Sequence, residues 1–163
     1  MRFVAVLAFL YASQAHALSC IPADPAGSFQ RFAESEKSYV VLYGTFDFNE
    51  RKLPKRPEGN PNNTKPNTFI PTTFVGKSLS QAGFVNDFSR DVTLNATCLG
   101  PWCSRMKSDV PTVAFVQKEG QKYTLTIGPC GGAAFTKPDQ RLLNTLTACI
   151  RGETCERSDG MFK

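Results

Sequence analysis

The fold of this chain is constrained most by two apolar runs. A short polar turn joins them, and cysteines lie at their ends. Residues 113–116 and 123–127 are rich in β-branched and aromatic side chains, and Gly120 lies in the turn between them. This pattern predicts an antiparallel hairpin. Half of the six cysteines lie at its ends: Cys98, Cys103 and Cys130. The hairpin is therefore expected to form the covalently anchored centre of the fold.

The N-terminal residues 1–17 predict export. They hold one basic residue, an apolar run and small residues around Ala15-His16-Ala17, the pattern of a signal peptide that is cleaved after Ala17. We therefore expect a periplasmic or extracellular protein, and the short leader favours a bacterial envelope protein. An alternative is that Ala17-Leu18-Ser19-Cys20 acts as a lipobox and that Cys20 carries a lipid anchor.

Export places the cysteines in an oxidising compartment, where an even number of them predicts disulfides. All six are candidates, and the sequence alone does not choose among their pairings: Cys20, Cys98, Cys103, Cys130, Cys149 and Cys155. The chain after the leader is long enough for one modest core. We expect a monomer with a single domain over residues 18–156 and a flexible tail at 157–163. No later segment is long and apolar enough to cross a bilayer.

Histidine is the most informative absence. The single histidine, His16, leaves with the predicted signal peptide. Nucleophile arrangements that use a histidine base and histidine-based zinc sites are then excluded, and oxidised cysteines exclude thiolate chemistry. No pair of carboxylates stands out. We therefore expect a protein that is not an enzyme and that has no metal site and no cofactor.

Positive charge is concentrated in one segment. The formal net charge is +5, and five basic side chains lie within residues 49–67: Arg51, Lys52, Lys55, Arg56 and Lys65. The segment is also rich in proline and asparagine, which predicts a long exposed loop. We call residues 49–67 the basic loop. Its charge has two interpretations, a solvated loop or a surface for an anionic partner.

Three further strands are predicted before the hairpin. Residues 39–48 form a long central strand, in which Gly44 marks a bulge or bend. Residues 68–79 form a second strand with an irregularity near Pro71. Residues 84–98 form a third, half-buried strand, because its apolar side chains fall at alternate positions.

Two helices are predicted to flank the strands. Ser28 can cap a short helix that ends near Lys37. Towards the C-terminus, Thr136 can cap an amphipathic helix that Gly152 stops. Five strands between these helices predict a mainly β fold, a five-stranded Greek-key barrel of the oligonucleotide/oligosaccharide-binding (OB) type.

The order of these features resembles a known family. A cysteine near the N-terminus and a short helix precede the strand segment Y-V-V-L-Y-G-T-F; then come C-L-G-P-W-C, a hairpin ending in I-G-P-C-G-G, and the helix L-L-N-T-L-T-A-C-I-R-G. Together they resemble the netrin-like domain of tissue inhibitors of metalloproteinases and of their bacterial relatives. The resemblance covers most of residues 20–155 and rests on order and cysteine placement. It implies an exported, disulfide-bonded domain that binds a protein.

Family inhibitors begin with Cys-x-Cys, and the first of these cysteines chelates the zinc of the protease. This chain departs from that pattern, since Leu18 stands two positions before Cys20. Cys20 is similar to the second cysteine of the pair, which in the family ties the N-terminal segment to the barrel. The resemblance thus implies a Cys20–Cys130 link. The preferred set adds two short-range links: Cys98–Cys103 and Cys149–Cys155.

Trp102, the only tryptophan, lies within the segment 98–103. It either packs over a disulfide or anchors a partner at the surface. The same segment has a redox interpretation, with Cys98 and Cys103 exchanging a disulfide, although reactive pairs more typically have Cys-x-x-Cys spacing at a helix N-terminus. The glycines around Cys130 predict a turn, because the lysine of a phosphate-binding loop is missing. We expect no nucleic-acid partner, because most aromatic residues fall at core positions.

Two functional classes remain open. The first is a binding module that contacts a protein or envelope component through Trp102 and the basic loop, with protease inhibition as a narrower version. The second is an exported thiol-disulfide protein or another kind of catalyst. The first predicts no free thiols, whereas the second predicts a readily reduced disulfide.

Overall fold

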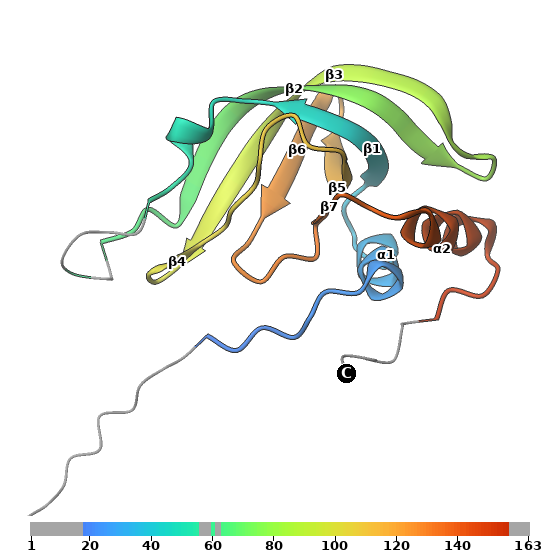
Figure 1. The fold of residues 1–163 in the computed structure, drawn as a ribbon, viewed down its shortest axis with the longest axis horizontal. Coiled ribbons are helices and arrows are strands. Elements are labelled where there is room, and N and C mark those ends of the chain that lie inside the picture. Colours follow the sequence, from blue (N-terminus) through green and yellow to red (C-terminus); the bar gives the residue numbers. More distant parts are fainter. Residues whose placement is uncertain (1–17, 56–59, 61–62, 157–163) are drawn as a thin grey trace, which may run out of the picture.

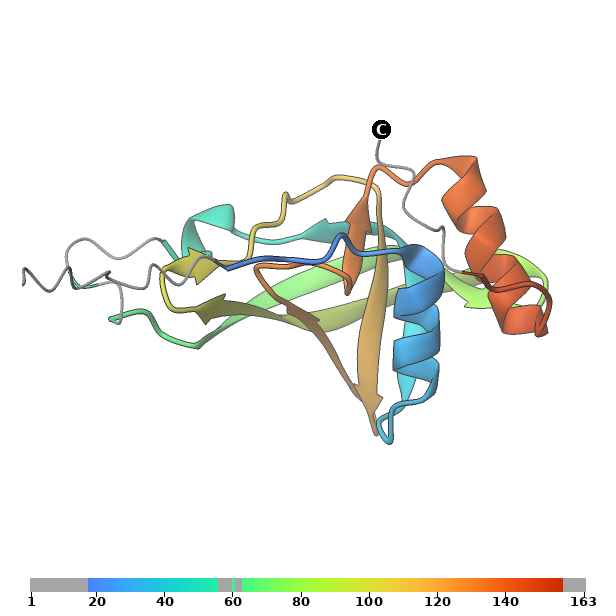
Figure 2. The same ribbon diagram turned by 90° about the horizontal axis from the view of Figure 1, so that it is seen from below.

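A computed structural model describes residues 18–55, 60 and 63–156. The predicted signal peptide at 1–17, the predicted tail at 157–163 and Arg56 lie outside the described residues. Within them, the chain forms a β-barrel with two helices packed against one side, as the two perpendicular views show (Figure 1, Figure 2).

Five strands form the barrel: β1 (Tyr39–Asp47), β2 (Asn67–Ser80), β3 (Gly83–Leu99), β5 (Thr112–Glu119) and β6 (Lys122–Ile127). They follow the order β1-β2-β3-β6-β5, and β5 pairs again with β1. These pairs are antiparallel except for β3 with β6. The order β5-β1-β2-β3 is a Greek key that β6 closes into a ring, so the predicted mainly β, five-stranded OB-type barrel is confirmed.

Two short strands that the sequence pattern does not predict extend this barrel. Strand β4 (Trp102–Cys103) pairs with the end of β3, and β7 (Ala134–Thr136) pairs with the start of β5. Both are too short to show an alternation of apolar and polar residues, which is why the pattern misses them.

Strand β1 is covered on both faces, which explains its dense run of β-branched and aromatic residues. Leu42 and Phe46 belong to the core cluster inside the barrel. Val41 and Tyr43, at the alternate positions, pack into a second cluster, under the helices. Two layers of core therefore meet at this strand.

The predicted irregularity at Pro71 is wrong, and of the bulge or bend predicted at Gly44 the bulge is absent. Gly44 lies in regular register opposite Gly76. Pro71 also keeps the register of β2 with β3, and the shift falls between Ser78 and Leu79. Strand β1 does not pair with β2 at Pro71, so the proline lies where β2 is an edge strand, a position that tolerates its missing N–H.

Helix α1 (Pro25–Ala33) begins and ends earlier than predicted. Its N-cap is Asp24, whose side chain accepts a hydrogen bond of 2.6 Å from the Gly27 N–H. Ser28, the predicted cap, is instead buried inside the helix. A proline at the first helical position, directly after an aspartate, gives the stronger start.

Helix α2 (Gln140–Arg151) is capped by Asp139, which accepts from the Leu142 N–H at 2.8 Å. The prediction that Thr136 caps this helix is wrong, because Thr136 belongs to β7. The predicted stop is confirmed: Gly152 adopts the left-handed conformation, with a φ of 74°.

The helices cover the outer face of β5 and β1. Leu146 of α2 is fully buried in a cluster with Val113 and Phe115 of β5. Phe32 of α1 stacks on Phe115, with ring centroids 4.8 Å apart. This second apolar cluster holds both helices on the barrel.

Each of the six cysteines is bonded, in the pairs Cys20–Cys130, Cys98–Cys103 and Cys149–Cys155. The preferred set of disulfides is therefore confirmed. Three disulfides indicate an oxidising, exported compartment. Neither helix in the described part of the chain has the length and apolar character needed to span a bilayer.

Candidate functional site

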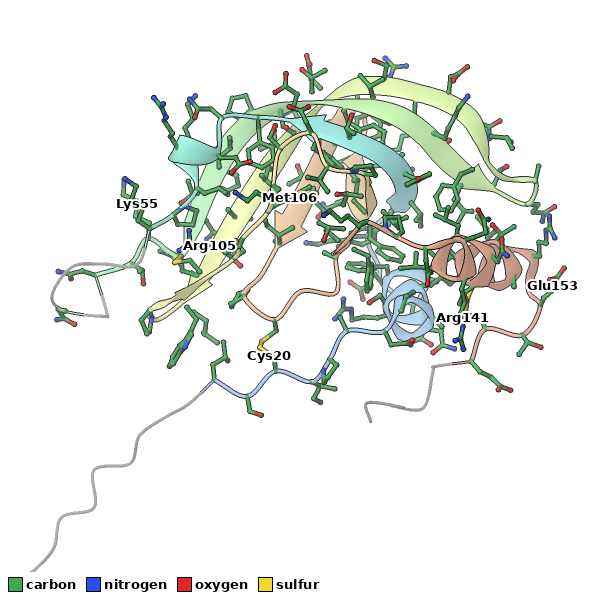
Figure 3. All side chains as sticks on the ribbon, in the orientation of Figure 1. Cys20, Lys55, Arg105, Met106, Arg141 and Glu153 are labelled. Atoms are coloured by element: carbon green, nitrogen blue, oxygen red, sulfur yellow. A yellow bond between two sulfur atoms is a disulfide. The ribbon has the colours of Figure 1, made fainter. Side chains whose placement is uncertain are left out.

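Three segments that are distant in the sequence meet at one end of the barrel. They are residues 18–22, the turn between β3 and β4 at 99–102, and the loop at 129–130, and we call them together the end surface. The Cys20–Cys130 bond, which links residues 110 positions apart, ties the first segment to the third (Figure 3). The N-terminal segment is therefore held covalently against the barrel.

The hairpin of β3 and β4 presents two large apolar side chains. Cys98 pairs with Cys103 and Leu99 pairs with Trp102, so the disulfide lies on one face and the apolar pair on the other. The turn between them begins with Gly100, whose φ of 55° suits a tight hairpin. The disulfide thus fixes the hairpin that carries Leu99 and Trp102.

These side chains are exposed although they are large and apolar. Trp102 is 36% exposed, Leu99 57% and Ile21, in the N-terminal segment, 82%. Isolated apolar residues at a surface are common, but Leu99 and Trp102 are paired on one hairpin that a disulfide closes, and neighbouring exposed apolar side chains mark an interaction site. Of the two interpretations of Trp102, this placement favours the surface anchor.

A small cleft opens within the end surface, and we call it the end cleft. Its volume is about 260 Å³, and its lining comes from the N-terminal segment, the β4 region and the loop before Cys130: Leu18, Cys20, Pro101, Trp102, Cys103, Arg105 and Pro129. The lining mixes apolar side chains with polar groups, and Arg105 is its one charged side chain.

The first residues of the basic loop are held at the same end of the barrel as the end surface. It starts with the short helix η1 (Glu50–Lys52), and Leu53 behind it is buried, so this part is less exposed than predicted. Glu50 accepts hydrogen bonds from the Ser108 N–H at 2.9 Å and from Lys107 Nζ at 3.2 Å. The Ser108 N–H, and secondarily Lys107, lower the pKa of the Glu50 carboxyl.

The loop is fixed at its other end as well. The Thr64 hydroxyl donates to the Gly100 carbonyl at 2.6 Å, and the Cys98 N–H donates to the Pro66 carbonyl at 3.1 Å. The last residues of the basic loop therefore run beside the turn that precedes Trp102. Both ribbon views place η1 and β4 at the same end of the molecule (Figure 1, Figure 2).

The predicted partner-binding residues are accordingly brought to one end. Trp102, Arg51, Lys52 and Lys55 are all exposed there, while Arg56 lies outside the described residues. Figure 3 shows Lys55 and Arg105 at this end, away from Arg141 and Glu153 near α2.

Sequence reasoning missed Leu18, Ile21 and Arg105. The sequence gives no clear signal for Arg105: Ser104 and Met106 are buried on either side of it, but Ser104 is polar, so an alternation of apolar and polar residues does not show in the sequence. No local signal marks Leu18 or Ile21, since only the disulfide at Cys20 places them.

The secondary structure around the predicted redox pair differs from that around typical reactive cysteine pairs. Cys98 and Cys103 face each other across two paired strands, and both are half-buried. Neither lies at a helix N-terminus, where the helix dipole lowers the pKa of a thiol. The bond closes a hairpin, as a structural disulfide does.

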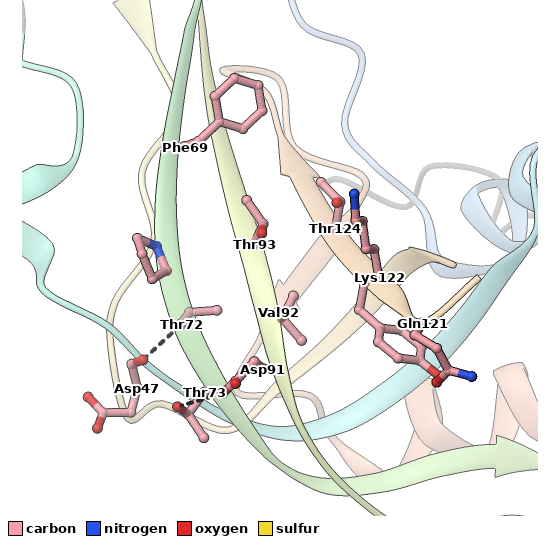
Figure 4. A pocket seen from close by; sticks show the side chains of 12 residues that line it. Asp47, Phe69, Thr72, Thr73, Asp91, Val92, Thr93, Gln121, Lys122 and Thr124 are labelled. Atoms are coloured by element: carbon pink, nitrogen blue, oxygen red, sulfur yellow. Dashed lines mark hydrogen bonds between the residues drawn. The ribbon is translucent and has the colours of Figure 1, made fainter. Parts of the chain in front are cut away.

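A second hollow, of about 720 Å³, lies on the side of the barrel (Figure 4). It is formed by β2, β3, the end of β1 and the start of β6 with the turn before it, a region where OB-type barrels bind ligands. Phe69 is 64% exposed there, and two carboxylates, Asp47 and Asp91, line the hollow with one ammonium group, Lys122. This charge balance disfavours a phosphate backbone.

Within the described ranges, no three histidine, cysteine or acidic side chains are placed to hold a metal ion together. Comparison of the chain with protein-family models, with curated proteins and with solved structures finds no match.

Proposed function

We propose that this protein is a periplasmic or extracellular, non-enzymatic binding domain that docks a partner protein of the envelope or its surroundings through the end surface. One observation carries the proposal: Leu99, Trp102 and Ile21 are exposed on segments that two disulfides hold in place.

Rigidity is the physical reason why this surface suits binding. Ordering a flexible loop when a complex forms opposes association, and a segment that is already fixed avoids that cost. The Cys98–Cys103 bond closes the hairpin of Trp102, and the Cys20–Cys130 bond holds the neighbouring N-terminal segment. Large aromatic side chains in rigid surroundings are typical centres of protein interfaces.

The resemblance to netrin-like inhibitors supports a protein as the class of partner. In that family the N-terminal segment makes the contact, and here the corresponding segment, around Cys20, is part of the end surface. Zinc chelation by the family's mechanism is not expected, because Leu18 and Ser19 precede Cys20. The proposed docking therefore depends on the side chains of the surface.

Site-specific photo-cross-linking tests the proposal. A photoreactive amino acid replaces Leu99 in the end surface and, in a matched control, Val85, which is also an exposed apolar residue of β3. Each protein is irradiated with exported proteins from the source organism. We expect discrete adducts from position 99 that an excess of unmodified protein suppresses, and none from position 85.

Two results would contradict the proposal. Adducts that are the same from both positions, or that unmodified protein does not suppress, would indicate non-specific contact. Adducts from neither position would remove the basis for a docking surface at this end of the barrel.

Intact mass distinguishes the alternatives. The proposed domain begins at Leu18 and takes up alkylating reagent only after reduction. Free thiols at Cys98 and Cys103 would favour the redox protein. A lipid-sized increment on Cys20 would favour the lipoprotein, and the sulfur of Cys20 could then not be bonded to Cys130.

A further inference from the structure

The end cleft combines an aromatic wall with an unpaired guanidinium group. Trp102 forms part of the lining, and Arg105 lies in the same cleft. Within the described chain, the side chain of Arg105 is exposed and has no hydrogen bond or ion pair. Its five N–H donors are thus available to a ligand.

Further positive charge surrounds this end. Four exposed cations of the basic loop also have no ion pair with any residue that the structure describes: Arg51, Lys52, Lys55 and Lys65. The acidic residue of η1, Glu50, is already engaged by Ser108 and Lys107. Asp47, at the end of β1, lines the separate hollow on the side of the barrel. Arg105 and these four cations therefore place several unpaired positive charges at the end of the barrel that carries the end surface.

We propose that the end cleft binds a glutamate or aspartate side chain from an acidic segment of the partner protein. Arg105 pairs with the carboxylate, and Trp102 packs against the apolar part of the segment. This inference rests on the proposed function and specifies the chemistry of the partner.

The chemistry of both residues fits this ligand. The planar guanidinium group of arginine matches a carboxylate with two parallel hydrogen bonds. The indole supplies a large apolar surface for the neighbouring atoms. The cations of the basic loop lie outside the cleft, where they attract an acidic segment over a longer range and accelerate its association.

The concave shape favours a peptide over a lipid surface. A protein that lies on a membrane inserts protruding apolar side chains among the lipids. Here Trp102 and Arg105 line a cleft whose volume suits the insertion of a side chain from a partner. A lipid surface is therefore the competing outcome in the test.

The first step of the test is a selection from a library of random peptides displayed between two fixed flanks, so that no free C-terminus is present. The wild-type protein is the target, and the Arg105→Gln variant is used for counter-selection. We expect the enriched peptides to be rich in glutamate or aspartate next to apolar residues. Enrichment without acidic residues would overturn the proposal.

Tryptophan fluorescence provides the second step. Because Trp102 is the only tryptophan, its emission reports directly on the cleft. The best enriched peptide is titrated beside a twin in which glutamine replaces each glutamate and asparagine replaces each aspartate. We expect a saturable change in emission, with binding weaker by about tenfold or more for the neutral twin and for Arg105→Gln. Added salt should weaken binding further.

A matched control separates the cleft from charge in general. Arg90 is an exposed arginine nine residues before Leu99 on β3, about 30 Å away along the strand. We expect the Arg90→Gln variant to bind the acidic peptide as the wild type does. Equal weakening by Arg90→Gln and Arg105→Gln would overturn the assignment of the carboxylate to the cleft.

The remaining outcomes distinguish a failure of the acidic-ligand proposal from a failure of the proposed docking function. If no peptide binds while position 99 still gives specific cross-links, the acidic ligand is wrong and the docking surface stands. If neither experiment detects a partner, both proposals fail. If vesicles of anionic phospholipid change the emission of Trp102 and the peptides do not, the surface binds membranes and the peptide proposal is overturned.

Discussion

Gly44 of β1 and Gly76 of β2 lie opposite each other, and the ring of Phe74 lies close to both. A Cβ atom on Gly44 would be 2.7 Å from the Gly76 Cα and 2.8 Å from the Phe74 Cζ, and a Cβ on Gly76 would be equally crowded. Phe74 is completely buried. Its ring therefore occupies the space that side chains at both glycines would need.

Alanine at either glycine is accordingly expected to destabilise the protein. Gly44→Ala and Gly76→Ala should each lower the free energy of unfolding by about 1–3 kcal/mol, because Phe74 and the opposing backbone must move. Urea unfolding measures the change. Gly128→Ala is the control, since the nearest atom to its Cβ would be Thr97 Oγ1 at 3.6 Å. A loss at Gly44 as small as that at Gly128 would contradict the close packing.

The three disulfides should differ in their effect on stability. Cys20–Cys130 joins residues 110 positions apart, whereas the other two bonds join residues 5 and 6 apart. In the chain-entropy treatment, replacing both cysteines of the long link by serine costs about 4–5 kcal/mol, and each short link costs about 2 kcal/mol. Denaturant unfolding of the three double variants gives the ranking. Equal losses would show that the closed loop does not govern the contribution.

The start of α2 gives a third prediction. Asp139→Ala removes the side chain that accepts from the Leu142 N–H and should cost about 1 kcal/mol. Thr136→Ala changes the residue that the sequence pattern favours as the cap, and should cost less than about 0.5 kcal/mol. Thermal or urea unfolding compares the two. A larger loss from Thr136→Ala would place the start of the helix earlier than the structure has it.

The same region shows why helix ends were predicted less well than strands. Thr136 and Asp139 both precede the apolar periodicity, and both residue types cap helices. The choice between them comes from a tertiary contact: the Lys137 N–H donates to the Pro111 carbonyl at 2.7 Å, which keeps this segment in the sheet. Such a contact leaves no mark in the local sequence.

Strands and barrel type were predictable because their signals are local and consistent. β1, β3 and the β5–β6 hairpin each show apolar runs or alternation, and their sequence order permits few barrels. The role of Gly44 was not predictable in the same way. A glycine in a strand indicates a bulge or a close approach, and only its pairing with Gly76, far along the chain, decides which.

The candidate site was predictable in part for a similar reason. Trp102 and the basic residues of the loop stand out by composition, so they were identified. Leu18 joins Trp102 only because the Cys20–Cys130 bond brings the N-terminal segment to the cleft, whereas Arg105 reaches it through the course of the chain just after β4. A cleft built from three distant segments cannot be recognised within one of them.

Glu50 makes the stability of the basic loop depend on pH. In the folded protein its carboxylate accepts hydrogen bonds from the Ser108 N–H and from Lys107, which lowers its pKa below the usual value. A lowered pKa in the folded state means that the carboxylate stabilises the fold above the pKa of the unfolded chain. This contribution is lost as the pH falls through the lower pKa of the folded state.

The Glu50→Gln variant should therefore be less stable than the wild type near neutral pH, and the difference should shrink as the solution becomes acidic. Urea unfolding of both proteins from about pH 7 to about pH 3 measures this trend, because the range covers the ordinary titration of glutamate. Glu36→Gln serves as the control, since Glu36 is exposed and its side chain makes no hydrogen bond or ion pair with the described residues. A difference for Glu50→Gln that stays constant across this range would show that its charge does not hold the loop to Ser108.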